Sequence, residues 1–303
     1  MTGDIRLGLV GFGKIAREEH LPAIAATPGA RLIAVASRNA RADGFAHYPD
    51  LESMLVGEPD INAVALCQPP QVRYDSARMA LQAGKHVFLE KPPGATLSEV
   101  ATLVHLAKAQ GVTLYASWHS RHAMGVDQAQ QWCANNQLRK VTITWKEDVR
   151  RWHPGQDWIW EAGGFGVFDP GINALSILTK ILKDRVRLID AALHIPANRN
   201  APIAAELSMA TAGGVPVTAE FDWRHTGTQT WQIRFEGENG DHLFSQGGDV
   251  ADDAVLGREY HIMYRHFVQL VRTGHSDVDM APLTLVADAF MRGTIDRVEA
   301  FED

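Results

Sequence analysis

The chain has 303 residues, of which 46% are hydrophobic and 21% charged, and its formal net charge at pH 7 is −7. This length favours two domains, and the composition is ordinary for a soluble globular protein. The acidic balance argues against binding to nucleic acids or to an anionic membrane surface, because both require clustered Lys and Arg, which no segment has. The segment MTGDIRLGLVGFG has no basic region followed by a long apolar core, and no run of about 18 apolar residues occurs, so we expect a cytoplasmic protein.

Residues 5 to about 116 alternate short apolar runs with amphipathic stretches. The apolar runs expected to be strands are IRLGLVG, RLIAVAS, INAVALC, HVFLE and VTLYAS, and the expected helices are 14–26, 71–84 and 97–110. Thr96 and Gly111 suit the start and the end of the last helix. Because apolar strands between helices are typical of a parallel sheet covered on both faces, we predict a doubly wound α/β domain over residues 1–120.

The pattern changes after about residue 120 to longer strands in which apolar and polar residues alternate. The expected strands are KVTITWKED, AELSMATAG, VPVTAEFDW and TWQIRFEG, and the expected helices are about 166–183, 258–273 and 282–300. Such alternation is typical of an antiparallel sheet with one buried face. We therefore predict a second, α+β domain over residues 121–303 with a mostly antiparallel sheet.

A glycine-rich segment, GLVGFGKIA, connects the first expected strand to the first expected helix. Gly11, Gly13 and Ala16 form the pattern G-x-G-x-x-A. In this context Gly11 permits a tight turn, Gly13 lets the backbone approach a pyrophosphate, and Ala16 allows close packing of helix on strand. The alternative is an ordinary glycine turn. The position in the first strand–helix unit favours a dinucleotide site, and hence a Rossmann domain.

The end of the second expected strand predicts the choice of dinucleotide. An acidic residue here would bind the 2′-hydroxyl of NAD, but the sequence has Ser37 and Arg38. A hydroxyl and a guanidinium suit a 2′-phosphate, so we expect NADP to be preferred, with some use of NAD. The alternative is that Arg38 is an ordinary solvated surface residue.

Further cofactor contacts are expected from the glycine turn and from the ends of the third and fourth strands. These residues are Lys14, Ile15, Cys67, Gln68, Pro69, Glu90 and Lys91. Cys67 could instead be a buried thiol without such a role. The two cysteines are too few for a disulfide framework, and no His or Cys cluster has metal-ligand spacing, so we predict no metal.

A lysine directly after a buried strand, in HVFLEKPPG, is unusual because lysine is rarely buried without a partner or a function. With the G-x-G-x-x-A turn, NAVALCQPP, AGKHVFLEKPPGATLSEV and, less strongly, EAGGFGVFDPGINAL, this segment resembles the Gfo/Idh/MocA family of sugar and polyol oxidoreductases. The resemblance implies that Lys91 lies near the nicotinamide and the hydroxyl to be oxidised, with Glu90 beside it. A cation there would stabilise a developing alkoxide and assist removal of the proton. The alternative is a structural ion pair at the end of a strand.

Asp169 and Asn173 lie four residues apart, hence on one face of the expected helix. Many family members have a histidine where this chain has Asn173, and an asparagine cannot act as a general base. Proton transfer is then expected from Lys91 and Asp169, with Asn173 orienting a sugar hydroxyl. The alternative for Asp169, which precedes a proline, is a helix N-cap.

Other candidates for substrate binding come from the second domain and from the end of the fifth strand. Alternation places Glu147 at the end of the apolar face of its strand, where it either binds a ligand or pairs with Arg150 or Arg151. The remaining candidates are Trp152, His153, Trp231 and His119. Aromatic rings and carboxylates together suit a sugar. Trp231 could instead belong to the core or to an interface, and His119 is equally compatible with a structural role.

Within the family, one set of residues is similar to the pocket of members that oxidise C1 of L-arabinose and D-galactose: Lys91, Glu147, His153, Asp169 and Asn173. The resemblance therefore implies oxidation of an aldose to an aldonolactone with reduction of NADP or NAD. The alternatives are another sugar or inositol dehydrogenase and a non-catalytic NADP-binding sugar sensor. Exposed alternating strands also suggest a homo-oligomer.

Overall fold

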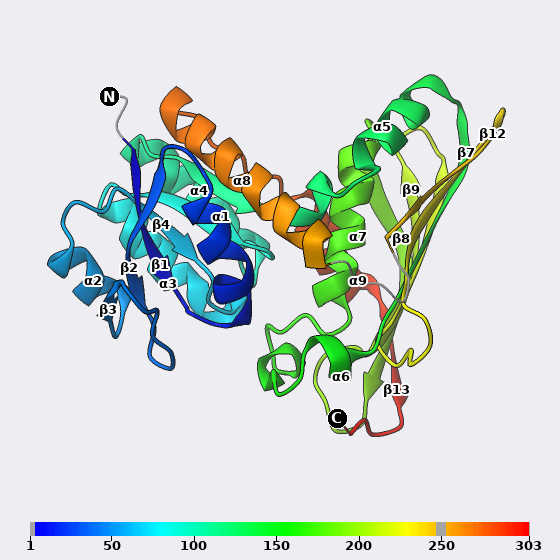
Figure 1. Cartoon of the computed structure of the whole chain (residues 1–303). Coiled ribbons are helices and arrows are strands. Elements are labelled where there is room, and N and C mark those ends of the chain that lie inside the picture. The colour runs from blue at the N-terminus through cyan, green and yellow to red at the C-terminus, as the bar shows by residue number, and fades with distance from the viewer. Residues whose placement is uncertain (1–3, 247–252, 303) are drawn as a thin grey trace. The chain divides into compact units, whose positions relative to one another are not determined.

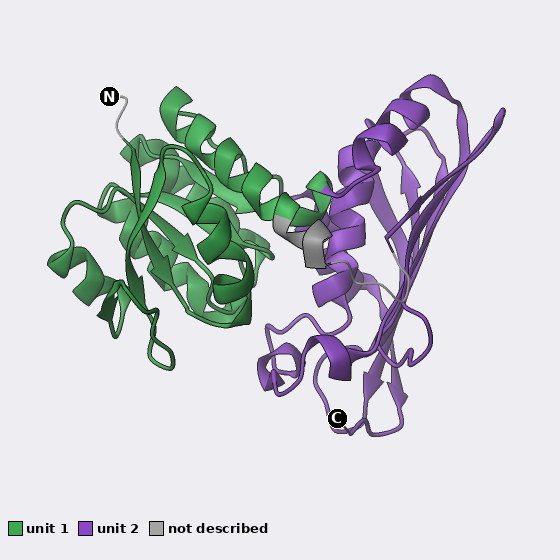
Figure 2. Ribbon diagram, viewed as in Figure 1, with its two compact units in different colours: residues 1–122, 253–279 green, residues 123–252, 280–303 purple. Residues whose placement is uncertain are grey.

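A computed structural model describes residues 4–246 and 253–302 and divides the chain into two compact units (Figure 2). Unit 1 comprises residues 1–122 and 253–279, and unit 2 comprises residues 123–252 and 280–303. The units differ from the ranges expected from the sequence, because residues 253–279 pack with the first unit and not with the second. The physical reason is the apolar face of the helix in this segment, which is buried in the core of unit 1.

Unit 1 contains a parallel sheet of six strands in the order β3-β2-β1-β4-β5-β6. The strands are β1 (Ile5–Val10), β2 (Ala30–Ala36), β3 (Ala46–Tyr48), β4 (Ala63–Leu66), β5 (His86–Glu90) and β6 (Leu114–Ser117). The order reverses at β1 and β4, as in a Rossmann fold, so the carboxyl ends of these strands form the edge where ligands bind. The predicted doubly wound α/β domain is confirmed.

Helices lie on both faces of this sheet (Figure 1). They are η1 (Ala16–His20), α1 (Leu21–Ala25), α2 (Leu51–Gly57), α3 (Pro70–Gln82), α4 (Leu97–Gln110), η2 (His119–His122) and α8 (Asp253–Thr273). Thr96 and Glu99 form a capping box at the start of α4, and Gly111 ends it with φ of 64°. The short β3 and α2 were not predicted, because neither has a long apolar period.

Two apolar cores, one on each face, enclose the sheet of unit 1. On one face Leu7, Leu9 and Phe88 pack with Tyr264 and Phe267 of α8. On the other face the strands pack against helices α2, α3 and α4 through residues that include Met54, Leu81 and Leu103. Because the strands are buried on both faces, their sequences are almost entirely apolar.

Unit 2 is built on a sheet of seven strands in the order β12-β11-β7-β10-β9-β8-β13. The strands are β7 (Leu138–Lys146), β8 (Val186–Pro196), β9 (Ala204–Thr211), β10 (Pro216–Asp222), β11 (Thr230–Gly237), β12 (Gly240–Ser245) and β13 (Thr294–Val298). The pairs β7/β10 and β8/β13 are parallel and the others antiparallel, which confirms the expected α+β unit with a mostly antiparallel sheet.

The helices of unit 2 cover one face of its sheet (Figure 1). They are α5 (Val126–Asn135), α6 (Val149–Trp152), η3 (Asp157–Trp160), α7 (Phe168–Ile181) and α9 (Ala281–Arg292). Burial alternates along β10, so its other face is open. In the described part of the chain, no helix is both long and apolar enough to cross a membrane.

The end of the chain differs from the helix expected over residues 282–300. Helix α9 ends at Arg292, because Gly293 takes an extended conformation with ψ of 142°. The following residues form β13, which pairs in parallel with β8. All residues of β13 are at least partly exposed, so buried and exposed positions do not alternate along it. The strand therefore depends on its pairing with β8.

Candidate active site

The glycine turn after β1 has the geometry that the sequence pattern requires. Gly11 has φ of +87°, a conformation that favours glycine, and a Cβ atom built there would lie 3.0 Å from the backbone nitrogen of Gln68. A Cβ built at Gly13 would meet no atom within 4 Å, and Ala16 is fully buried. The backbone at Gly13 is therefore open to a ligand, while Lys14 and Ile15 beside it are exposed.

Replacing each of these two glycines with alanine should cause a different defect. Gly11→Ala should lower the free energy of unfolding by about 1–3 kcal/mol, because alanine is strained at this φ. Gly13→Ala should leave the Tm unchanged and weaken NADP binding about tenfold, because its methyl group would lie where the pyrophosphate approaches. Thermal unfolding and a fluorescence titration with NADPH measure the two effects. Normal NADPH affinity in Gly13→Ala would contradict this assignment.

Other cofactor candidates lie at the ends of β2 and β4. Ser37 is half-buried, and Arg38 is exposed and forms no ion pair with any residue that the structure describes. Cys67 is partly buried and packs against the core of unit 1, and the Oε1 atom of Gln68 is buried without a hydrogen-bond partner. A free guanidinium, an open glycine and an orphaned amide oxygen fit a dinucleotide that carries phosphates and a carboxamide.

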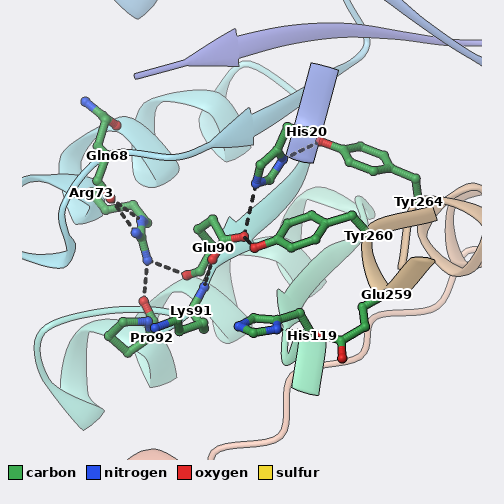
Figure 3. Close-up of polar contacts among 10 residues, drawn as sticks. All are labelled: His20, Gln68, Arg73, Glu90, Lys91, Pro92, His119, Glu259, Tyr260 and Tyr264. Atoms are coloured by element: carbon green, nitrogen blue, oxygen red, sulfur yellow. Dashed lines mark hydrogen bonds and ion pairs between the residues drawn. The ribbon is translucent and has the colours of Figure 1, made fainter. Parts of the chain in front are cut away.

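Glu90, at the end of β5, lies in a network of buried polar groups (Figure 3). Its Oε1 atom accepts hydrogen bonds from Nε2 of His20 at 3.0 Å and from the hydroxyl of Tyr260 at 2.8 Å. Its Oε2 atom accepts from the backbone nitrogen of Lys91 at 2.7 Å. Nδ1 of His20 lies 2.7 Å from the hydroxyl of Tyr264. The carboxylate is therefore fixed from three sides, and it holds the backbone of the candidate catalytic lysine.

The charges in this network stabilise each other. Burial by itself would raise the pKa of the Glu90 carboxyl, but hydrogen bonding and charge attraction from His20, with contributions from His119 and Tyr260, hold this pKa at about 2. Burial would lower the pKa of His20, but interactions with Cys67 and Glu90 raise it to about 10. The lowered pKa of Glu90 and the raised pKa of His20 favour an ion pair, in which Nδ1 of His20 donates to the hydroxyl of Tyr264.

His119 lies in the same region of unit 1 (Figure 3). Its Nδ1 atom lies 2.8 Å from Oε2 of Glu259, and its ring stacks on Tyr260 with 5.7 Å between ring centroids. The side chain of His119 is 12% exposed and that of Glu259 only 3%. The buried carboxylate of Glu259 thus fixes the orientation of this imidazole.

In unit 2, Glu147 lies directly after β7 and is 3% exposed. Its two carboxylate oxygens accept hydrogen bonds from indole nitrogens, Oε1 from Trp223 at 3.1 Å and Oε2 from Trp231 at 2.7 Å. The ring of Trp231 also lies 5.6 Å from that of Trp152, centroid to centroid. The structure therefore brings the predicted Glu147, Trp152 and Trp231 together. The suggested partners of Glu147 are engaged elsewhere: Arg150 pairs with Asp148 at 3.6 Å, and the guanidinium of Arg151 lies over Trp152.

The second carboxylate of unit 2, Asp169, is 5% exposed and lies in the first turn of α7. Its Oδ2 atom is 3.4 Å from Nε2 of His153, whose ring packs against Trp223. Asp169 is not an N-cap, because the N-cap position of α7 is Val167. Asn173, one turn later, is half-buried. The buried Asp169 and the partly exposed His153 thus form a polar pair close to Trp223, which binds Glu147.

Comparison with known proteins identifies the family to which the chain belongs. The model of the Gfo/Idh/MocA family matches residues 5–117, and its description is an oxidoreductase family with an NAD-binding Rossmann fold. Galactose 1-dehydrogenase of Pseudomonas fluorescens is 44% identical over 306 aligned residues, which cover 99% of this chain and 99% of that protein. This chain belongs to the Gfo/Idh/MocA family.

Solved structures of oxidoreductases also resemble this Gfo/Idh/MocA protein. The crystal structure of D-galactose-1-dehydrogenase from Rhizobium etli has a TM-score of 0.92 and 52% identity, and the match covers 100% of this chain and 99% of that one. A 3-ketoreductase of Actinomadura kijaniata, solved with NADP and TDP-benzene, has a TM-score of 0.79 at 20% identity, which shows a common fold. The chain is thus an oxidoreductase with an NAD(P)-binding Rossmann domain.

The sequence analysis missed Trp223, which binds Glu147 in unit 2, and Glu259 and Tyr260, which contact His119 and Glu90 in unit 1. Trp223 follows β10, which runs parallel to β7, so both strands end at the same edge of the sheet. Alternation along VPVTAEFDW could have placed Trp223 on the face of Glu147. The sequence offered no comparable signal for Glu259 and Tyr260, because α8 was assigned to the other domain. Among the described residues, no group of three His, Cys, Asp or Glu side chains could hold a metal.

Proposed function

We propose that this protein is an aldose 1-dehydrogenase that oxidises C1 of D-galactose and L-arabinose to the aldonolactone. The observation that carries the proposal is the group of buried carboxylates and indoles in unit 2, where Glu147 is bound by Trp223 and Trp231 and Asp169 lies beside His153. Carboxylates bind sugar hydroxyls, and indole rings pack on the apolar C–H faces of pyranoses. The two galactose 1-dehydrogenases that resemble the whole chain support this substrate class.

Lys91 and Asp169 carry the chemical step in this proposal. When NAD(P)⁺ is bound, it supplies the acceptor for the hydride that leaves C1. Asp169 accepts the proton of the C1 hydroxyl, and the ammonium of Lys91 stabilises the negative charge that develops on its oxygen. Asn173 has no basic group, so its role is to orient a hydroxyl by hydrogen bonding. Glu147 and His153 bind further hydroxyls of the ring.

The same residues explain why two sugars are proposed. D-galactose and L-arabinose share their ring configuration and differ by one exocyclic CH₂OH group. Discrimination by such a group is worth only about 1–3 kcal/mol, so one site can accept both sugars. The difference should appear in the KM values for the two sugars more than in kcat.

We also propose that NADP is preferred over NAD, because Arg38 is exposed at the end of β2 without an ion-pair partner among the described residues. Arg38→Ala should lower kcat/KM for NADP⁺ about tenfold and change that for NAD⁺ less than twofold, because only NADP has a 2′-phosphate for the guanidinium. Arg41→Ala, which removes an exposed arginine close by, is the matched control. Steady-state kinetics with both cofactors provide the test. An unchanged ratio in Arg38→Ala would show that Arg38 does not select NADP.

A panel of aldoses and polyols, assayed for reduction of NADP⁺ and NAD⁺, tests the proposed function. We expect turnover with D-galactose and L-arabinose and formation of the aldonolactone, identified by NMR. Turnover confined to inositol or to other sugars would instead favour a different dehydrogenase of the family. Binding of NADP without turnover of any aldose would favour a sugar sensor.

Self-association through the open face of the sheet in unit 2 is a further part of the proposal. This face carries a hollow of about 520 Å³, and its lining includes Thr142, Thr144, Glu206, Ser208 and Glu220. We expect this uncovered face to pack against the same face of a second copy, since most homo-oligomers are symmetric and two-fold dimers are the commonest. Size-exclusion chromatography with light scattering measures the mass in solution, and a monomer would contradict this part.

A further inference from the structure

Arg73, on helix α3, is a charged side chain with only 2% of its surface exposed. Its guanidinium donates to backbone carbonyls at the carboxyl edge of the sheet in unit 1 (Figure 3). Nε donates to the carbonyl of Gln68 at 3.0 Å, and Nη2 donates to the same oxygen. Nη1 donates to the carbonyls of Glu90 and Pro92. One buried cation thus joins the segment after β4 to the segment after β5.

The chemistry of these contacts requires an arginine. Carbonyls at the ends of strands lack a partner within the sheet, and burying them without hydrogen bonds would be costly. A guanidinium presents several donors in a fixed plane, whereas a lysine ammonium is a compact charge that cannot reach three oxygens in the same geometry. The carbonyl dipoles in turn compensate the buried positive charge of Arg73.

Two of these carbonyls lie on either side of the candidate catalytic Lys91. Glu90 and Pro92 are the residues immediately before and after Lys91, and Nη1 of Arg73 binds both. The carboxylate of Glu90 also accepts from the backbone nitrogen of Lys91. The main chain of Lys91 is therefore held on both sides by a group that is remote in the sequence.

We propose that Arg73 is a positioning residue for Lys91, which it serves by fixing the backbone on either side of this lysine. The inference rests on the proposed function, in which Lys91 stabilises charge at the C1 oxygen. A group that stabilises a transition state must be held within about 0.5 Å of its productive position. Arg73 acts through the main chain of Glu90 and Pro92 and makes no contact with the reacting atoms.

The test compares Arg73→Lys with Arg78→Lys, a matched control on the same helix. Arg78 is 45% exposed and contacts Asp75 at 3.5 Å. Each variant is assayed for kcat and KM with D-galactose and NADP⁺, for the deuterium isotope effect with C1-deuterated galactose, and for hydrogen exchange of peptides covering residues 86–96. Arg73→Gln, which keeps a planar donor group, is the second variant if Arg73→Lys does not fold.

We expect Arg73→Lys to lower kcat about 10–100-fold, because a misplacement of about 1 Å at a catalytic group has an effect of this size. The KM for galactose should change less than threefold, the isotope effect on kcat should rise, and exchange should increase in residues 86–96 but not in the peptides of β1 and β2. Arg78→Lys should match the wild type in every measurement.

Two results would overturn the inference. One is a kcat within twofold of wild type in Arg73→Lys. The other is an increase of exchange throughout unit 1 with kcat falling only in proportion to the folded fraction, which would give Arg73 a general structural role. If wild-type protein oxidises no aldose, the proposed function fails. Hydrogen exchange still decides then whether Arg73 holds the segment around Lys91, so the two failures are distinguishable.

Discussion

Replacing Lys91 with alanine is expected to lower kcat/KM for D-galactose about 10³-fold while NADPH still binds with nearly normal affinity. The reason is electrostatic: negative charge develops on the C1 oxygen in the transition state, as its proton leaves ahead of the hydride, and the variant has no ammonium to stabilise this charge. The backbone of residue 91 should stay in place, because its nitrogen is held by the carboxylate of Glu90 at 2.7 Å. Stopped-flow and steady-state kinetics measure the effect on the reaction, and fluorescence titration measures cofactor affinity.

Lys108→Ala is the matched control for this prediction, because Lys108 is an exposed lysine of α4 in the same unit. It should retain wild-type kcat and KM. Lys91→Arg keeps a positive charge with a different shape, and it should recover only a small part of the lost activity. Near-normal turnover by Lys91→Ala would rule out the proposed role of Lys91. Lost NADPH binding would mean that Lys91 mainly holds the cofactor.

Replacing His20 with alanine is expected to lower the free energy of unfolding by about 3–5 kcal/mol, the usual result of leaving a buried charge unpaired. His20 is fully buried, and its Nε2 atom lies 3.0 Å from Oε1 of Glu90. The variant also leaves the hydroxyl of Tyr264 without the hydrogen bond from Nδ1. Urea unfolding at pH 6 measures the change. His105→Ala, at an exposed histidine of α4, is the control and should change stability by less than about 0.5 kcal/mol.

The effect of His20→Ala should depend on pH in a defined direction. The lowered pKa of Glu90, about 2, stabilises the fold fully above its ordinary value of 4.5, and this stabilisation is lost as the pH falls toward 2. The raised pKa of His20, about 10, stabilises the fold fully below 6.5, and this stabilisation is lost as the pH rises toward 10. The difference in unfolding free energy between wild type and variant should therefore be largest between about pH 4.5 and 6.5. A difference that is constant from pH 4 to 9 would contradict an ionised His20–Glu90 pair.

Most of the fold could be predicted because local patterns and tertiary structure agree. The apolar runs at β1, β2, β4, β5 and β6 are each too short for a helix and are separated by amphipathic segments. The parts that could not be predicted depend on pairing between distant segments. β13 has no buried face of its own and exists because it pairs with β8. Helix α8 was predicted as an element, but its partner was not, because an amphipathic helix does not specify which sheet covers its apolar face.

The candidate site was predictable to a similar degree. Alternation along β7 correctly placed Glu147 on the face of Ile143 and Trp145, all of which are buried. The sequence left the partners of Glu147 open, and they proved to be indoles more than seventy residues away. Arg73 was missed for a related reason: its position within a helix of mixed polarity predicts a solvated side chain. Contacts between a side chain and distant carbonyls leave no periodic pattern in a sequence.

Because α8 belongs to unit 1, this unit cannot finish folding until most of the chain has been synthesised. A ribosome completes β1 to β6 long before it reaches Tyr260, Tyr264 and Phe267, which cover Phe88 and one face of the sheet. Until then the nascent chain exposes that apolar face to solvent or to chaperones, and Glu90 and His20 lack their tyrosine partners. The last residues then return to unit 2, where β13 completes the sheet. A chain truncated before α8 should therefore be degraded rather than accumulate as a working nucleotide-binding fragment.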